Sequence, residues 1–430
     1  MNLDALRGRL RSVWKAWGPQ MGHPATGYLL VLMVVAGVAL RIQRVGYPFT
    51  WGFDEEQMVS AARQFLIGLP DTGECCHPPL SKLLISASIL LFQDNPMGWR
   101  FASLCLGIQS IVLVFLIASS LFNDRRAGWL AAAFMAADGF FIAFSRDAFP
   151  EGMMTTFVLW AMLAAVTARS WLGVLACGTM IGLAGSIKWS GFQVGLPALV
   201  AILLLRRVPW YSLVSFAVIP LVHAAVWMIG LKLVGRPNDL MSVLEEMKAR
   251  QNRHLGFVHF SNSLESAWYT WFVLYHPFVL KRANVGELVR LASSVSNPVL
   301  FAAGDVCLLG LPVVGTALAV SSRFRERWRQ WLDTGFNKAL IILGVSWLSM
   351  MLLWFSGRIS MYWYHYLTPW SFGILLVAGV ATRLDRHFPK EVLYFVLMML
   401  AVFVYFAPVW GEFAISVPAA HRRLISPMWR

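Results

Sequence analysis

Charged residues are scarce in this chain. Asp, Glu, Lys and Arg make up only 13% of its 430 residues, whereas soluble globular domains contain about 25%. Hydrophobic residues account for 58% of the sequence, and the mean hydropathy is +0.62. This composition excludes an ordinary soluble domain, and the sequence therefore predicts a polytopic membrane protein.

Cysteine is also sparse, and its pattern argues against a structural metal site. The five cysteines include no CxxC pair and no Cys/His spacing typical of zinc ligands. Cys75 and Cys76 are adjacent, and adjacent cysteines rarely form a comfortable disulfide, so we interpret them as two loop cysteines.

Two further features are missing. No internal repeat is visible, which argues against a secondary transporter because many transporters contain one. No cleavable signal is evident either. The basic residues within 1–25 precede a long apolar segment, which predicts a cytoplasmic N-terminus followed by an uncleaved anchor.

Long apolar segments dominate the rest of the sequence. About eleven of them are candidate spans, and they lie near residues 26–45, 98–121, 127–144, 151–168, 171–187, 189–205, 211–234, 298–321, 338–356, 364–382 and 391–409. The prediction is an all-α polytopic membrane protein with a transmembrane domain over 26–410 and a tail over 411–430. Residues 80–92 are apolar but too short to cross a core of about 30 Å, so we expect an interfacial helix there.

Two long polar segments, 46–97 and 235–297, interrupt the apolar pattern. The net charge of +14 comes largely from Lys and Arg in short connections. With a cytoplasmic N-terminus, all five cytoplasmic connections are basic, as the positive-inside rule requires. Both long polar segments and the basic tail are then external. This distribution favours membrane orientation over nucleic-acid binding as the reason for the positive charge.

Three consecutive acidic residues, Asp54, Glu55 and Glu56, follow the first apolar segment. A helical pattern begins at this point, so the positive end of a helix is expected beside them. One carboxylate here suits general-base work on an alcohol, and another could position an acceptor or a metal ion. The alternative is a solvated loop in which Asp54 caps the helix.

A second motif, HPPLSK at residues 77–82, lies in the same external segment. Its two prolines stop the preceding structure and fix how the chain enters the next helix. We expect His77 and Lys82 to line the site. The alternative is a turn in which Lys82 extends toward the membrane surface.

Polar residues also lie in two short external turns. Arg146 and Glu151 belong to SRDAFPE at 145–151, and Lys188 precedes Trp189. The planar guanidinium of Arg146 suits a lipid-linked phosphate, and Lys188 offers a second phosphate contact. The alternatives are a Glu151 placed at the positive end of the next helix and a Lys188–Trp189 anchor at the membrane surface.

The last candidates are Arg358, which precedes an aromatic stretch at 361–367, and Tyr364 and His365, which lie within it. They could stack on a sugar or hold a phosphate, or they could form an aromatic belt at the interface. Arg250 and its basic neighbours in the second polar segment are interpreted as a charged external face.

Seven short motifs follow one another along nearly the whole chain. They are FDE at 53–55, HPPLSK at 77–82, NPMGWR at 95–100, SR at 145–146, KWSG at 188–191, NPV at 297–299 and YHYL at 364–367. In this order they resemble the protein O-mannosyltransferase family, a group of membrane glycosyltransferases that use polyprenyl-phosphate sugars.

The resemblance implies a GT-C-like fold with about eleven spans, an external first loop that carries the catalytic acid, and sugar transfer from a lipid phosphate. It makes Asp54 the base with Glu55 beside it, and it places Arg146 and His365 in the donor or phosphate site.

The chain departs from the family in three places. Glu151 stands where an Asp usually opens the fourth span, and Ser81 stands where a Gly is usual. The second external segment is too short for the lectin-like domain of eukaryotic members. We therefore expect a compact, prokaryotic relative in the plasma membrane.

The expected reaction is an inverting transfer of a sugar, most simply mannose, from a polyprenyl (dolichyl-type) phosphate to a Ser or Thr hydroxyl of an exported protein. A lipid, glycan or cell-wall acceptor is the alternative within the same class, and a transporter or lipid flippase is the alternative outside it. The expected partners are the donor, the acceptor and membrane lipids, without nucleic acid. No cofactor is required, and a divalent cation is left open.

Overall fold

The computed structural model describes residues 18–47, 50–71, 76–255, 264–331, 334–355, 361–426 and 429. Within them, seven helices are long and apolar enough to cross a membrane. They are α2 (Pro24–Ile42), α5 (Pro96–Phe122), α11 (Val218–Leu233) with the turn before it, α13 (Pro298–Val320), α15 (Thr334–Phe355), α16 (Leu367–Asp385) with the turn before it, and α17 (Pro389–Trp410). The protein is therefore a multi-pass membrane protein.

The expected total of eleven spans is not confirmed. Helices α6 (Arg125–Ala136) and α7 (Gly139–Ser145) meet at 66°, and counting them as one broken span gives eight within the described residues. Helices α8 (Pro150–Thr167), α9 (Trp171–Ile187) and α10 (Gly195–Leu205) occupy three other expected positions without meeting the same criteria.

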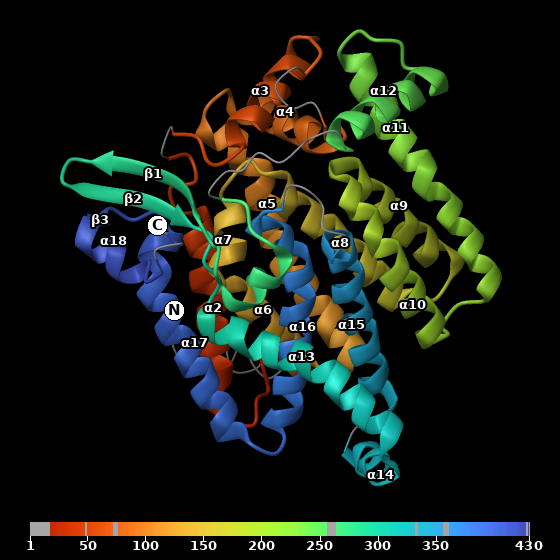
Figure 1. Ribbon diagram of the computed structural model, residues 1–430, viewed down its shortest axis with the longest axis vertical. Helices are drawn as coiled ribbons and strands as arrows, with labels where there is room; N and C mark the ends of the chain where they lie inside the picture. Colours follow the sequence, from red (N-terminus) through yellow and green to blue (C-terminus); the bar gives the residue numbers. More distant parts are fainter. Residues whose placement is uncertain are drawn as a thin grey trace, which may run out of the picture.

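The two ends of the helix bundle differ (Figure 1). One end carries α3 (Glu55–Leu66), α4 (Leu80–Phe92) and α12 (Leu240–Leu255), and we call it the site end. The opposite end carries α14 (Ser322–Trp331). The 13-residue apolar helix α4 confirms the short helix expected over 80–92.

Hydrogen bonds and ion pairs join the N-terminal segment to the α5–α6 and α16–α17 connections, at the end of the bundle opposite the site end. The backbone N–H of Gly22 donates to Asp385 Oδ2 over 2.8 Å, and Arg126 Nη1 lies 3.3 Å from the same oxygen. Arg386 Nη2 donates to Asp124 Oδ2 over 3.0 Å. These segments therefore share one end of the bundle, as the topology read from the sequence requires.

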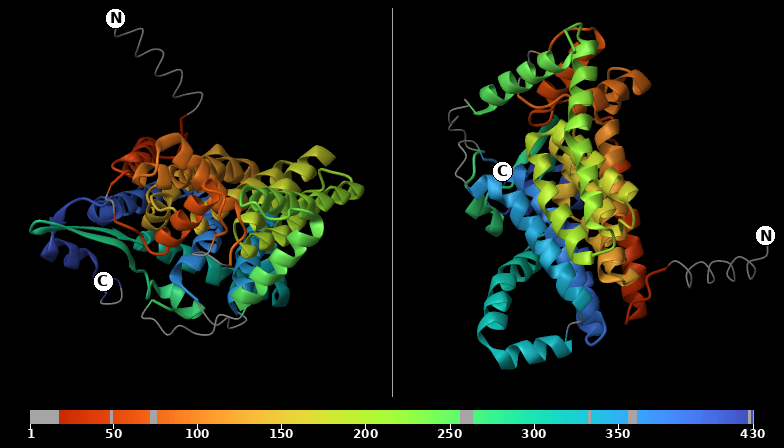
Figure 2. Two further views of the ribbon diagram at one scale, coloured as in Figure 1. Left: turned by 90° about the horizontal axis from the view of Figure 1, so that it is seen from above. Right: turned by 90° about the vertical axis from the view of Figure 1, so that its right-hand side faces the viewer.

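A small antiparallel sheet, which the hydropathy pattern does not predict, lies at the side of the site end (Figure 2). Strands β1 (Val279–Val285) and β2 (Leu288–Ser293) form a hairpin, and β3 (Ile415–Ser416) pairs with β2. The last helix, α18 (Val417–Arg423), follows β3. The C-terminal tail thus packs against the second long polar segment.

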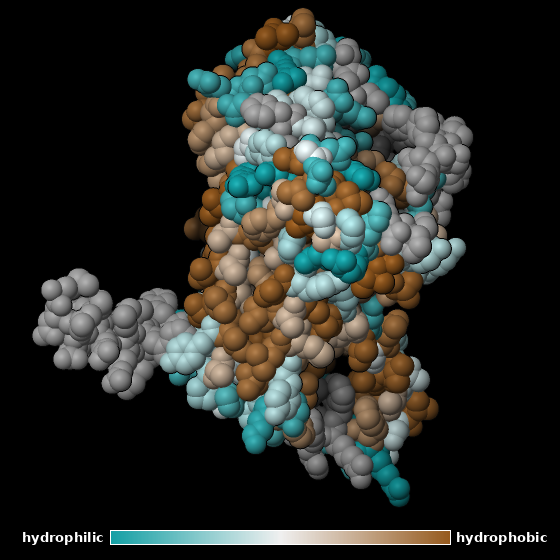
Figure 3. Space-filling view, turned by 90° about the vertical axis from the view of Figure 1, so that its left-hand side faces the viewer, coloured by the Kyte–Doolittle hydropathy of each residue, from teal (hydrophilic) through white to brown (hydrophobic). Residues whose placement is uncertain are grey.

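The core lies where α6, α7, α8 and α16 meet. Helix α2 packs closely on α6, because a Cβ on Gly37 of α2 would lie only 2.2 Å from the carbonyl oxygen of Ala136 in α6. Asp138 lies between α6 and α7 and caps the start of α7, where its side chain accepts a hydrogen bond from the N–H of Phe140 at 3.0 Å. On the face drawn in Figure 3, hydrophobic residues cover much of the lower half, and hydrophilic residues gather in the upper part and at the lower edge. A broad hydrophobic surface is expected of a lipid-facing bundle.

Candidate active site

Asp54 immediately precedes α3 at the site end. Its backbone is left-handed, with φ 47°, a conformation that Asp tolerates better than most residues. The side chain is half-buried and makes no capping bond to the helix that it precedes. The capping alternative is therefore not supported, and the carboxylate lies at the positive end of α3.

Glu55 is fully buried and tightly held. Its two oxygens accept bonds from Arg100 Nε at 2.7 Å and Arg100 Nη2 at 2.8 Å. The backbone N–H groups of Gly52 and Ala148 donate to it at 2.9 and 3.0 Å. Although burial opposes ionisation, Lys281 and Arg100 lower the pKa of Glu55. Glu55 therefore anchors the start of α3, and its carboxylate does not face an open substrate site.

Arg146 is also buried, and most of its donors are used inside the protein. Its Nη1 donates to the carbonyl oxygens of Leu40, Arg41 and Gln43 at 2.6, 3.0 and 2.7 Å. Its Nε lies 3.3 Å from Glu412 Oε1 in the C-terminal tail. This geometry supports a role of Nε and Nη1 in joining α2 to the tail. Within the described residues the buried Nη2 makes no hydrogen bond, so the contact with a donor phosphate stays a prediction.

Lys188, Glu151 and Tyr364 come together from three distant parts of the chain. Lys188 Nζ lies 2.5 Å from Glu151 Oε1 and 5.1 Å from the centre of the Tyr364 ring. The Tyr364 ring in turn lies 6.0 Å from the ring of Phe53, the residue before Asp54. The contact between the Tyr364 and Phe53 rings therefore links Lys188, the expected phosphate contact, to the segment that carries Asp54, the expected base.

His365 extends the aromatic part of the site. Its Nδ1 accepts a bond from the N–H of Tyr362 at 3.1 Å, and its ring stacks on Trp354 at 3.9 Å. Trp189 donates from its indole to the carbonyl oxygen of Cys76 at 3.0 Å, which joins it to the HPPLSK segment. Arg358 lies outside the described residues.

The HPPLSK segment is held by a buried charge cluster. Lys82 Nζ donates to Asp71 Oδ2 at 2.5 Å and to the carbonyl oxygen of His77 at 3.1 Å. Arg250 of α12 also pairs with Asp71, through Nη1 at 2.8 Å. Burial opposes the ionisation of Asp71, but Arg250 and Lys82 outweigh it and lower the pKa of Asp71. The interpretation of Arg250 as part of a solvated face is therefore wrong, because it ties α12 to the first external loop.

Asp71→Asn should lower stability by about 2–3 kcal/mol, because two buried cations lose the negative charge that they share. The loss is limited because Glu246 Oε1, 2.8 Å from Arg250 Nε, still balances the charge of Arg250 in the variant. Unfolding in detergent, followed by tryptophan fluorescence, measures the loss. Asp94→Asn is the control because its ion pair with Arg63 is exposed and should change stability by less than about 1 kcal/mol. Equal stability of the two variants would contradict the assignment.

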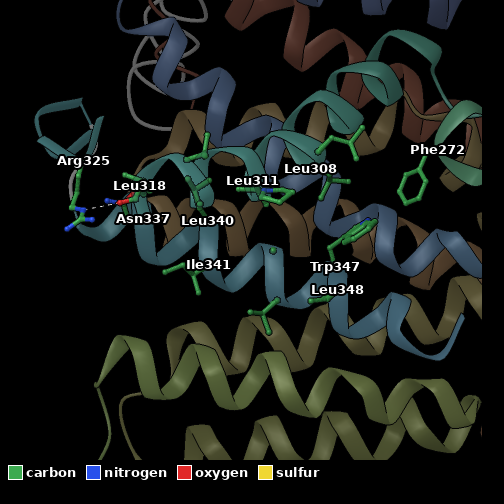
Figure 4. A pocket seen from close by; sticks show the side chains of 16 residues that line it. Phe272, Leu308, Leu311, Leu318, Arg325, Asn337, Leu340, Ile341, Trp347 and Leu348 are labelled. Carbon is green, nitrogen blue, oxygen red and sulfur yellow. Dashed lines mark hydrogen bonds between the residues drawn. The ribbon is translucent and has the colours of Figure 1, made fainter. Parts of the chain in front are cut away.

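An apolar groove of about 720 Å³ runs between α13 and α15 (Figure 4), within the size range of ligand pockets. Phe272 lies at one end of it and Arg325 at the other. The Phe272 ring packs 5.8 Å from Trp347 and 6.0 Å from Tyr366, the residue after His365. One end of the groove therefore borders the aromatic part of the site.

Metal ligands are the remaining question for the site. Within the part of the chain that the structure describes, no three His, Cys, Asp or Glu side chains are grouped so as to hold a metal ion.

Comparison with known proteins gives consistent results. A family model described as dolichyl-phosphate-mannose-protein mannosyltransferase matches residues 76–229. A polyprenol-phosphate-mannose–protein mannosyltransferase of Mycolicibacterium smegmatis is 22% identical over 94% of this chain and 93% of that protein. A protein of the same name from Mycobacterium tuberculosis is 29% identical over 32% of this chain and 33% of its own length.

Solved structures share the fold. The S. cerevisiae protein O-mannosyltransferase Pmt1–Pmt2 complex, bound to the sugar donor, matches with a TM-score of 0.79 at 11% identity and covers 96% of this chain and 94% of that chain. ArnT from Cupriavidus metallidurans matches with a TM-score of 0.54 at 15% identity, over 91% and 75% of the two chains. The GT-C-like fold and the family resemblance expected from the motifs are therefore confirmed.

Proposed function

We propose that this chain is a membrane enzyme of the protein O-mannosyltransferase family and that it transfers mannose from a polyprenyl phosphate to a Ser or Thr hydroxyl of an exported protein. The observation that carries the proposal is the contrast between two neighbouring carboxylates. Glu55 is locked in a buried ion pair, whereas Asp54 is half-buried at the positive end of α3 and does not cap that helix.

Asp54 acts as the general base. It accepts the proton of the acceptor hydroxyl while the hydroxyl oxygen attacks C1 of the mannose. The bond from C1 to the phosphate oxygen breaks, and the lipid phosphate leaves with the bonding electron pair. A single displacement inverts the configuration at C1. Because a phosphate leaves without protonation when a cation balances its charge, no second catalytic carboxylate is needed.

Lys188 supplies that cation. It is held by Glu151 and lies over Tyr364, and the Phe53–Tyr364 contact links it to the start of α3. His365 and Tyr364 form the aromatic wall beside it. Because Nε and Nη1 of Arg146 join α2 to the C-terminal tail, we assign these two groups to packing and keep Nη2 as an alternative phosphate contact. Arg358 is retained as an alternative phosphate contact.

The donor enters sideways from the bilayer. The groove between α13 and α15 suits its isoprenoid tail, because the lining is almost wholly apolar and one end borders the aromatic cluster around His365. In this arrangement the N-terminus is cytoplasmic and the site end faces the outside of a prokaryotic plasma membrane. The short basic connections favour this orientation.

Lys188→Gln should raise the KM for the donor by about 10–100-fold, because a charged hydrogen bond to phosphate contributes about 1.5–3 kcal/mol. Initial rates at varied donor concentration measure the effect. Lys188→Gln also leaves Glu151 buried without its cation, so the double variant with Glu151→Gln separates the two effects. The double variant should regain stability but keep the raised KM. A normal KM in either variant would remove Lys188 from the phosphate site.

The proposed activity is tested with purified protein in liposomes. The donor is polyprenyl-phosphate mannose, and a Ser/Thr peptide and a lipid acceptor are offered in parallel. Mannosylated peptide supports the proposal. Transfer to the lipid alone would shift the acceptor to the lipid class, and transfer to neither would contradict the proposal.

A further inference from the structure

The β1–β2 hairpin contains an irregularity that faces the start of α3. Val279 pairs with Ser293 and Lys281 with Ala292, so Leu280 is an extra residue in β1. The carbonyl oxygen of Leu280 accepts a bond from the N–H of Phe53 at 3.0 Å. An extra residue of this kind is a β-bulge, and bulges commonly redirect a strand beside an active site.

The bulge also brings Lys281 into the interior. Its Nζ donates to the carbonyl oxygen of Arg146 at 3.1 Å and lies 3.5 Å from Asp147 Oδ1 and 3.8 Å from Glu412 Oε1. The side chain is almost fully buried, which is unusual for lysine unless its charge is paired. The next residue, Arg282, is exposed.

Asp147 explains why a cation is needed at this place. It is fully buried beside Glu55, and burial together with Glu55 raises the pKa of Asp147. It lies so close to Gly52 that a Cβ there would be 2.0 Å from Asp147 Oδ2. Two carboxyl groups thus lie under the segment that presents Asp54. When both groups are ionised, their repulsion and desolvation are costly unless a positive charge lies close by.

We propose that Lys281 is a positioning residue for the transfer reaction and that the bulged strand β1 holds Asp54 in place. Lys281 compensates the carboxyl pair of Glu55 and Asp147, while the carbonyl of Leu280 fixes Phe53. Arg100, Arg146 and Glu412 are the other charged groups of this cluster, and Arg100 is committed to Glu55. The inference rests on the proposed function, because it assumes that Asp54 is the base.

Lys281→Met is the principal test, with Arg282→Met as a matched control on the same strand. Lys281→Met should lower kcat about 10–100-fold with an unchanged KM for the donor, because misplacement by about 1 Å can cost a rate factor near 10². Arg282→Met removes one exposed charge and should leave kcat unchanged. Lys281→Arg should retain most of the activity.

A double variant separates positioning from simple loss of folding. Adding Asp147→Asn to Lys281→Met removes the carboxyl that needs the lysine, and it should restore kcat at least severalfold. An unchanged kcat in folded Lys281→Met, or no recovery in the double variant, would overturn the inference. If Lys281→Met has no effect while Asp54→Asn abolishes transfer, only this inference fails. If Asp54→Asn is fully active, the proposed function fails first.

Discussion

Asp54→Asn should give a folded protein that transfers mannose about 10²–10⁴-fold more slowly than the parent. This range is the usual contribution of a general base. Asn has nearly the same shape as Asp but cannot accept the proton of the acceptor hydroxyl. Because Asn tolerates the left-handed backbone at this position as Asp does, the variant should still fold, which its melting temperature checks. The rate is measured under donor saturation in liposomes.

Glu56→Gln is the matched control for this experiment. Glu56 lies two residues further along the same helix start and is exposed, so its substitution removes one carboxylate without touching the proposed site. It should retain transfer within about twofold, since salt and water screen the charge of an exposed side chain. Near-normal transfer by Asp54→Asn would exclude Asp54 as the base.

Glu55→Gln should destabilise the protein by about 3–5 kcal/mol, because it leaves the buried guanidinium of Arg100 without its negative partner. Both side chains are fully buried, so water cannot replace the lost charge. The double variant Glu55→Gln/Arg100→Met removes both charges and should recover a large part of the stability. Denaturant unfolding in detergent measures all three proteins. A change below about 1 kcal/mol in Glu55→Gln would contradict the anchoring role.

The same ion pair predicts a pH dependence. The pKa of Glu55 is lower in the folded protein than its ordinary value, which is about 4.3 in unfolded chains. Its contribution to stability is therefore complete above that value and is lost as the pH falls through the folded pKa. Between pH 7 and pH 3, the parent should lose more stability than Glu55→Gln. Parallel curves for the two proteins would show that Glu55 is not the titrating group.

The sequence predicts well those features that depend on local composition. Hydropathy is a property of a single segment, so the positions of the spans and the short helix α4 follow from it directly. The positive-inside pattern likewise brings Asp54 and Lys188 to one end of the bundle. The number of spans is harder to predict from the sequence, because a break between helices such as that at Asp138 depends on hydrogen bonds to distant segments. One of these is the bond from the N–H of Asn297 to Asp138 Oδ2 at 3.1 Å.

Roles set by long-range pairing could not be predicted in this way. Arg146 suits a phosphate by its chemistry, but its Nη1 donors are taken by carbonyl oxygens more than 100 positions away. Lys82 and Arg250 form one cluster around Asp71, although Arg250 is 179 positions from that carboxylate. Nothing in the local pattern around Lys281 indicates its burial. Arg100 lies within a motif of the family, and that motif is the one available signal for the partner of Glu55.

The configuration at C1 of the mannosylated product distinguishes a single displacement from the alternatives. The reconstituted protein is given polyprenyl-phosphate mannose of known configuration and a Ser/Thr peptide, and the one-bond C1–H1 coupling of the product is measured by NMR. A single displacement with Asp54 as base predicts a mannosyl-peptide with the opposite configuration to the donor. A product that retains the donor configuration, or the absence of any mannosyl-peptide, would contradict the account.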